Sequence, residues 1–128
     1  MAKNGKRNFF CGDFIKMNLP KKYDLVFSHP VIDHVYDINM FFAKIIDVCK
    51  KYAYISSYLG YFPFLKNHIM NWDKEKGCYF NKLSVNEIKK NLIQNGLDET
   101  EFVVRKQEGG NLKDGIENET IIEIDRKF

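Results

Sequence analysis

The sequence has few cysteines, no cysteine pair at metal-ligand spacing, and no long apolar run. Its three cysteines, Cys11, Cys49 and Cys78, are far apart, so neither a disulfide framework nor a zinc knuckle is indicated. The apolar run before Gly12-Asp13 is too short for a signal-peptide core, and no stretch approaches the ~20 apolar residues of a membrane helix. We expect a cytoplasmic protein with reduced, mostly buried thiols, no metal and no membrane contact.

Strong charge of one sign is also lacking. The net charge is +3 in 128 residues, and the lysines are scattered rather than gathered as in a basic nucleic-acid-binding face. A nucleic-acid partner is therefore disfavoured. Hydrophobic residues make up 45% of the chain and aromatic residues 15%, which is enough for a core. The length favours a single domain over residues 1–128.

Three short apolar runs bounded by turn residues predict buried parallel strands at about 8–12, 23–28 and 52–57. Between the second and third, apolar residues at helical spacing predict a helix over 38–51, capped by Asp37. Lys50 and Lys51 then fall in its last turn, where positive charge complements the helix dipole. Strand, helix and strand in this order predict a βαβ unit.

The second half of the chain contains one strong local signal. Ser84 and Glu87 have capping-box spacing, and Gly96 suits a helix C-terminus, so a helix is predicted over 85–95. The aromatic-rich segment before it is expected to be irregular. Two strand-like runs at 101–107 and 119–127, joined by the glycine-bearing loop 108–118, predict an antiparallel hairpin.

The order of several short motifs resembles the middle of a known enzyme family. These motifs are Phe10-Cys11-Gly12-Asp13-Phe14, Leu19-Pro20, Tyr23-Asp24-Leu25-Val26-Phe27-Ser28 and Val31-Ile32-Asp33-His34-Val35-Tyr36-Asp37. Together they are similar to class I S-adenosylmethionine-dependent methyltransferases of the type-11-like, small-molecule kind. The resemblance covers residues 8–128 and implies an α/β fold: a truncated Rossmann-like sheet of three parallel strands plus the C-terminal hairpin.

The resemblance also implies that a part of the family's domain is missing. Only seven residues precede Asn8, whereas the family has two earlier strands there, one leading into a glycine-rich turn and one ending in a ribose-binding acid. Gly109-Gly110 cannot replace that turn, because no helix follows it. The cofactor site is thus expected to be incomplete in this chain: either another chain, such as a complementary N-terminal half, completes it, or this sequence is a fragment of a longer protein. Strand 8–12 is expected to move beside strand 23–28, unless a second copy covers that edge as a homodimer.

The resemblance assigns the cofactor S-adenosyl-L-methionine to a group of residues at two strand ends. It implies that the Asp13 carboxylate accepts the adenine amino group and that the Phe14 amide donates to a ring nitrogen. The residues implied to bind the cofactor are Gly12, Asp13, Phe14, Ser28 and His29. An ordinary turn is the competing interpretation of Gly12-Asp13.

Two histidines are candidate catalytic residues, because imidazole accepts and releases protons near neutral pH. His29 follows Ser28 at a strand end, and His34 lies in the stretch most similar to the family; a loop role and a packing role are the respective alternatives. Ser28-His29-Pro30 only partly matches the motif of nucleic-acid amino-methyltransferases, because no aromatic residue follows. The aromatic segment resembles the family's substrate cover, with Tyr58, Tyr61, Phe62 and Trp72 as candidate pocket residues, although such residues equally cover a sheet.

Two functions remain open from the sequence. The first is a methyltransferase, or its C-terminal half, that transfers a methyl group to a small-molecule acceptor. The second is a non-catalytic binding or scaffold module that keeps the fold and does not bind the cofactor alone.

Overall fold

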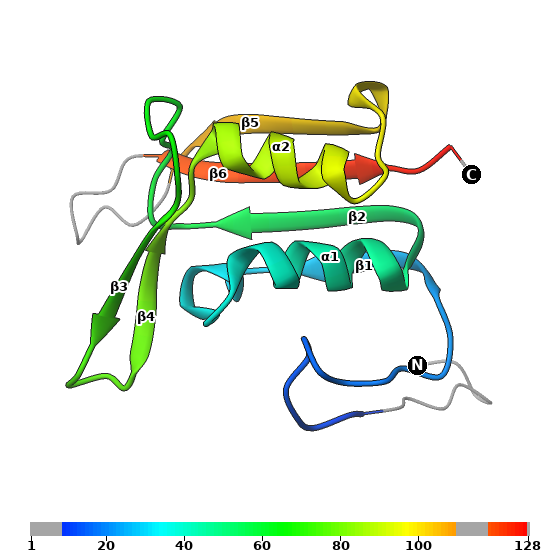
Figure 1. Cartoon of the computed structure of the whole chain (residues 1–128), viewed down its shortest axis with the longest axis horizontal. Coiled ribbons are helices and arrows are strands. Elements are labelled where there is room, and N and C mark those ends of the chain that lie inside the picture. Colours follow the sequence, from blue (N-terminus) through cyan, green and yellow to red (C-terminus); the bar gives the residue numbers. More distant parts are fainter. Residues whose placement is uncertain (1–8, 110–117, 128) are drawn as a thin grey trace.

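A mixed four-stranded sheet with two helices on one face forms the body of the molecule (Figure 1). The computed structural model describes residues 9–109 and 118–127. The strand order is β1-β2-β6-β5, in which β1 and β2 are parallel and the other neighbours antiparallel. The elements are β1 (Tyr23–Ser28), α1 (Ile38–Val48), β2 (Cys49–Ser57), α2 (Val85–Gln94), β5 (Phe102–Glu108) and β6 (Asn118–Asp125).

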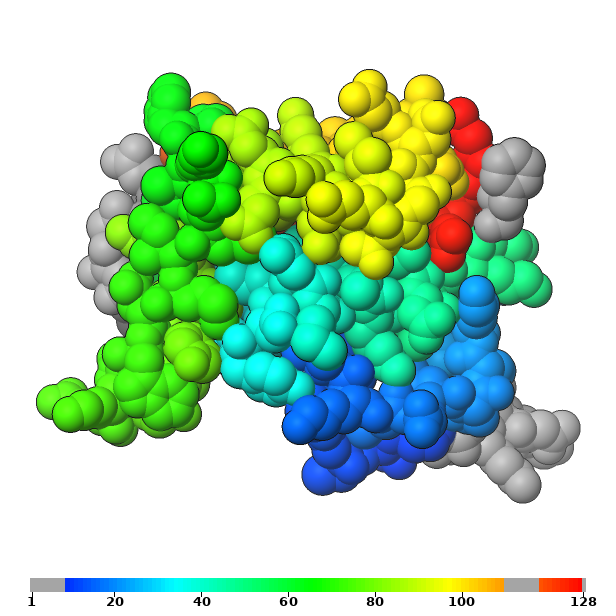
Figure 2. Space-filling model, in the orientation of Figure 1, coloured from blue at the N-terminus to red at the C-terminus, as the bar shows by residue number. Residues whose placement is uncertain are grey.

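The core lies between the sheet and the two helices. Ala53, Ile55, Ile122 and Ile124 have no exposed surface, and they meet the apolar sides of α1 and α2. Figure 2 shows this face closed by the two helices. Burial of large aliphatic side chains on this face supplies most of the driving force for folding.

The helix α1 is shorter than predicted. It ends at Val48, and Cys49 already has extended backbone angles, so the predicted helix 38–51 is too long. Pairing of β2 with β1 begins at Tyr23 opposite Cys49. Residues 49–51, which the helical spacing of apolar residues predicted to be in the helix, therefore belong to β2. Lys50 and Lys51 consequently lie exposed in β2 and not at the end of a helix.

The helix α2 agrees with its prediction within one residue, but its capping box is only half formed. The Ser84 side chain accepts a hydrogen bond from the Glu87 backbone N–H at 3.1 Å. The Glu87 carboxylate does not return to Ser84; it accepts from the His68 backbone N–H and from the Asn39 side chain, each at 2.9 Å. At the other end, Gly96 has a φ of +95°, the conformation expected of a helix C-terminal glycine.

The aromatic segment contains a hairpin and is therefore not irregular as expected. Strands β3 (Ile69–Asp73) and β4 (Cys78–Lys82) form a separate two-stranded sheet that projects from the left of the body in Figure 1. Two short 3-10 helices complete the described elements, η1 (Ile32–His34) after β1 and η2 (Glu99–Glu101) before β5. The predicted C-terminal hairpin is confirmed as β5–β6, and residues 110–117 of its loop lie outside the described residues.

The predicted first strand, 8–12, is wrong over the residues that the structure describes. Asn8 lies outside them, and residues 9–12 form no strand; Phe9 is 87% exposed and Cys11 is exposed, not buried as expected. The segment does not pair with β1, which ends the strand order, so the sheet has two parallel strands and not three. A short apolar segment becomes a strand only when a neighbouring strand supplies hydrogen bonds to its backbone. Here the chain makes a turn at residues 14–16, and Phe14 packs edge-on against Phe41 of α1 with ring centroids 5.6 Å apart.

Candidate functional site

Side chains from two chain segments meet where β1 and β2 end. Because these strands are parallel, their carboxyl ends lie at one edge of the sheet, which is where open α/β sheets bind ligands. Ser56 and Ser57 at the end of β2, and Tyr58 directly after it, each contact a residue of the segment that follows β1. The pairs are His29 with Ser56, Asp33 with Ser57, and His34 with Tyr58. We call this set the carboxyl-edge cluster.

Asp33 is the most deeply buried member of the cluster, with no exposed surface. One carboxylate oxygen accepts the Ser57 hydroxyl, and the other accepts the Tyr58 backbone N–H at 3.2 Å. Burial raises the pKa of Asp33 above its ordinary value, and the hydrogen bonds from Ser57 and Tyr58 oppose that rise. The side chain thereby ties η1 to the end of β2 and fixes the position of its neighbour His34.

His34 is held in one tautomer by its two partners. Its Nδ1 lies 2.8 Å from the Tyr79 carbonyl oxygen, which can only accept, so Nδ1 carries the hydrogen. Nε2 then presents its lone pair to the Tyr58 hydroxyl at 3.2 Å, and the ring packs edge-on against Phe80 at 4.9 Å. A histidine whose Nε2 accepts a hydrogen bond from a phenol is suited to proton transfer.

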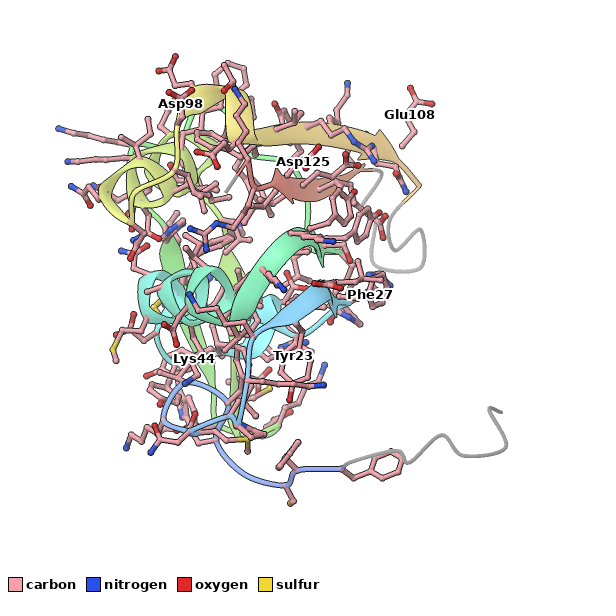
Figure 3. All side chains as sticks on the ribbon, turned by 90° about the vertical axis from the view of Figure 1, so that its right-hand side faces the viewer. Tyr23, Phe27, Lys44, Asp98, Glu108 and Asp125 are labelled. Atoms are coloured by element: carbon pink, nitrogen blue, oxygen red, sulfur yellow. The ribbon has the colours of Figure 1, made fainter. Side chains whose placement is uncertain are left out.

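His29 lies on the other side of the sheet from Asp33. It follows the buried Ser28, and its Nδ1 contacts the Ser56 hydroxyl. His29 and Ser56 line one end of a shallow groove of about 530 Å³ that continues along the outer face of β1 and β2. In Figure 3, where the helices lie to the left of the sheet, the labelled Phe27 marks this opposite face.

Asp13 is linked to the loop after β1 through a residue that the sequence analysis did not single out. The Tyr36 hydroxyl donates to one carboxylate oxygen at 2.6 Å, and the Ile15 N–H donates to the other at 3.0 Å. The hydrogen bond from Tyr36 lowers the pKa of Asp13 and raises the pKa of Tyr36 to about 12. Asp13 is thus an exposed carboxylate in a turn and not the tip of a strand.

The four predicted pocket residues are spread over the aromatic segment. Tyr58 belongs to the carboxyl-edge cluster, whereas Trp72, which is 56% exposed, packs edge-on against Tyr79 of the β3–β4 hairpin at 5.0 Å. Tyr61 and Phe62 are half-buried, and Phe62 forms an isolated bridge to Ser84. The hairpin therefore connects this segment to the site, because Tyr79 contacts both Trp72 and His34.

Comparison with known proteins gives a structural match without a sequence match. No protein-family model and no curated protein matches this sequence. One similar solved structure is the 1,6-didemethyltoxoflavin-N1-methyltransferase of Burkholderia thailandensis, bound to 1,6-didemethyltoxoflavin and S-adenosylhomocysteine, with a TM-score of 0.59 and 11% identity. Another is an S-adenosylmethionine-dependent methyltransferase of Mesorhizobium loti, with a TM-score of 0.55 and 14% identity. The chain has a methyltransferase-like fold.

The two alignments also show what share of each solved structure this chain covers. The two alignments cover 89% and 90% of this chain, but only 48% of the Burkholderia chain and 68% of the Mesorhizobium chain. The chain spans about half the length of the first of these structures. At such low identity the likeness shows the fold alone, and the substrates of the two proteins are not thereby those of this chain.

The described residues do not by themselves fit the whole cofactor. Between residues 9 and 109 and from 118 to 127, no glycine-rich turn leads into a helix beside β1, and such a turn is what lets a ligand approach backbone N–H groups. Both oxygens of Asp13 already accept hydrogen bonds. Over the same residues, no group of three or more His, Cys, Asp or Glu side chains could hold a metal ion, and none of the helices is long and apolar enough to cross a membrane.

Several members of the carboxyl-edge cluster were missed from the sequence. His29, His34 and Tyr58 were candidates, but Asp33, Ser56 and Ser57 were not. A signal for the two serines was present, because they end a buried strand just as Ser28 does. Asp33 had no comparable signal, since its burial depends on the end of β2 lying beside η1.

Proposed function

We propose that this chain is the acceptor-side part of an S-adenosylmethionine-dependent methyltransferase that acts on a small molecule. The observation that carries the proposal is the carboxyl-edge cluster, which gathers two histidines, a buried carboxylate and a tyrosine at the ligand-binding edge of a methyltransferase-like sheet. An open parallel sheet binds its ligands at this edge. We place the methyl acceptor at this edge of the sheet, next to the carboxyl-edge cluster.

In this proposal, the residues of the chain position the acceptor and handle its proton. Placing reactants in line supplies much of the acceleration of such reactions, about 7–11 kcal/mol for well-oriented groups. His34 holds the Tyr58 hydroxyl through Nε2, and that nitrogen takes up the proton that the acceptor loses by way of Tyr58. Tyr58 is proposed to contact the acceptor, with Tyr61, Phe62 and Trp72 as further candidate contacts, and His29 is the second candidate proton acceptor.

The exposed carboxylate of Asp13 is proposed to accept the adenine amino group of the cofactor, with Gly12 and Phe14 beside it. Ser28 and His29 are proposed to face the rest of the cofactor.

The test is a titration of the isotope-labelled chain with S-adenosylhomocysteine, followed by amide chemical shifts in NMR spectra. We expect a dissociation constant on the order of 1 mM, because a partial site makes only part of the contacts. The shifts should map to residues 12–15 and 28–29.

The matched variants for this titration are Asp13→Asn, which should abolish the shifts, and Asp47→Asn, an exposed aspartate on α1 that should leave them unchanged. Unchanged spectra of the wild-type chain at 10-fold the expected dissociation constant would refute the assignment of the cofactor to Asp13. The second candidate function, a scaffold module that does not bind cofactor, is favoured by the lack of a glycine-rich turn among the described residues. This scaffold function predicts that the spectra of a correctly folded wild-type chain do not change when S-adenosylhomocysteine is added.

A further inference from the structure

A buried histidine joins the base of the β3–β4 hairpin to the start of α2. His68 directly precedes β3, and Ser84, the N-cap of α2, follows β4 after Leu83. The Ser84 backbone N–H donates to His68 Nδ1 at 2.9 Å, just beyond the last strand pair, Ile69 with Lys82. Figure 1 shows this base where β4 leads into α2. The His68 side chain is only 6% exposed, so the hydrogen bond is largely shielded from water.

Further hydrogen bonds hold the segment before β3 to the same end of α2. The Ser84 hydroxyl donates to the Leu65 carbonyl oxygen at 2.6 Å, and the Asn86 side chain donates to that oxygen at 3.3 Å. The His68 backbone N–H donates to the Glu87 carboxylate at 2.9 Å. Together with the bond between His68 and Ser84, we call these contacts the hairpin latch.

The partners of His68 fix its tautomer. A backbone N–H can only donate, so Nδ1 faces Ser84 with a lone pair and the ring hydrogen is on Nε2. Nε2 lies 3.2 Å from Glu87 Oε2 but is not aligned for a hydrogen bond with it; that oxygen accepts from the Asn39 side chain at 2.9 Å instead. The structure therefore holds a neutral imidazole that has a carboxylate next to it.

Protonation of His68 is incompatible with the hairpin latch as it stands. The proton must add to Nδ1, because Nε2 already carries a hydrogen, and the Nδ1 hydrogen then faces the Ser84 N–H. Two donors cannot share a hydrogen bond, so this contact is lost. An imidazolium instead forms a charge-assisted hydrogen bond with a carboxylate, and Glu87 is within reach. The neutral ring is thus suited to Ser84 and the charged ring to Glu87.

The charges around His68 set the direction of its titration. Burial lowers the pKa of His68 below its ordinary value of 6.5, and the Glu87 carboxylate opposes that fall. Lys66 and Lys90 line a groove together with Glu87, and Lys82 lies at the hairpin base; these exposed cations do not favour a further positive charge. Because the folded pKa is lowered, the stabilising contribution of neutral His68 is complete above 6.5 and is lost as pH falls towards the folded value.

We propose that His68 makes the hairpin latch acid-sensitive: its neutral ring binds the Ser84 N–H, and its protonated ring turns to Glu87 and loosens the base of the β3–β4 hairpin. The hairpin also carries Tyr79, whose carbonyl oxygen accepts the His34 Nδ1 hydrogen at 2.8 Å. The latch therefore connects pH to the carboxyl-edge cluster. It rests on the contacts at the hairpin base and does not depend on the proposed methyl transfer.

The first experiment follows the wild-type chain by NMR spectroscopy from about pH 8 to about pH 5, the range in which histidines titrate. Long-range proton–nitrogen spectra should show the His68 ring with its hydrogen on Nε2 at neutral pH and a titration midpoint below 6.5. Hydrogen-exchange protection of the Ser84 amide should fall below that pH, by up to about tenfold per pH unit until the ring is protonated. A hydrogen on Nδ1 at neutral pH, or constant Ser84 protection, would overturn the proposal.

The second experiment compares matched variants. His68→Asn keeps an oxygen that can accept the Ser84 N–H but cannot be protonated in this range, so the additional fall in Ser84 protection should be absent. Glu87→Gln keeps an acceptor for the His68 N–H but removes the charge, so the midpoint of the His68 ring should move to lower pH. The control Glu99→Gln, an exposed residue of η2, should leave this midpoint unchanged.

Two results would reject the acid-sensitive latch. One is a fall in Ser84 protection in His68→Asn as large as that in the wild type. The other is an unchanged His68 midpoint in Glu87→Gln, and this result decides the question even if His68→Asn does not fold.

Discussion

The two faces of the four-stranded sheet differ sharply although they are built from the same strands. Towards the helices, Ala53 pairs with Ile124 and Ile55 with Ile122, and all four residues are fully buried. On the opposite face, Leu25 and Phe27 remain more than half exposed. The difference shows that the helix-covered face holds the fold together, whereas the outer face leaves apolar side chains of β1 exposed.

The largest effect should come from removing a core side chain on the covered face. Ile55→Ala is expected to lower the free energy of unfolding by about 2–5 kcal/mol, because it removes a buried aliphatic group and leaves a cavity. Leu25→Ala, on the outer face, is the matched control and should change it by less than about 0.5 kcal/mol. Urea unfolding followed by circular dichroism measures both. Equal losses in the two variants would contradict the division between the faces.

The next effect concerns Asp33, the buried carboxylate of η1 beside the end of β2. Asp33→Ala leaves the Ser57 hydroxyl and the Tyr58 N–H without their partner, and an unsatisfied buried donor costs about 1–3 kcal/mol. The exposed Asp24→Ala in β1 serves as the control and should be nearly neutral. The same unfolding experiment detects the difference. A neutral Asp33→Ala would show that Asp33 does not tie η1 to β2.

The same residue predicts a dependence of stability on pH. Burial raises the pKa of Asp33, so its favourable contribution is complete below the unfolded value and is lost as pH rises through the folded value. Asp98 and Glu101 have lowered pKa values, which act with the opposite sign. The prediction therefore concerns the difference in the free energy of unfolding between the wild type and Asp33→Asn. As pH rises above 3.8, the wild type should lose stability relative to this variant. The control Asp47→Asn should show the same pH dependence as the wild type.

The smallest effect is expected on the charged half of the outer face. Arg105 and Glu123 are both partly exposed, and such surface pairs couple by about 0.2–1 kcal/mol. A double-mutant cycle with Arg105→Met and Glu123→Gln, measured by thermal unfolding at low and high salt, gives the coupling energy. A value that exceeds this range and persists at high salt would mean that this half of the face is more shielded than its exposure indicates.

Several elements could be predicted because their signals are local. Ser84 and Gly96 mark the two ends of α2, and the runs around β5 and β6 are separated by a glycine-bearing loop that allows a hairpin. The position of Ser28 and His29 at a strand end made them candidates, and the resemblance of the stretch around His34 to the family made that histidine a candidate. The partners of these residues were not all predictable. Tyr36 reaches Asp13 across 23 residues of sequence, and Ser57 reaches Asp33 across 24.

The sequence by itself determined which segments are apolar, where α2 begins and ends, and that β1, α1 and β2 form a βαβ unit. Only the tertiary structure decided that residues 9–12 are not a strand and that residues 49–51 belong to β2 and not to α1. It also decided that apolar side chains of β1 stay exposed on one face of the sheet. The physical reason is that a strand is defined by its neighbours. Its backbone hydrogen bonds are made with residues distant in the chain, whereas those of a helix close within four residues.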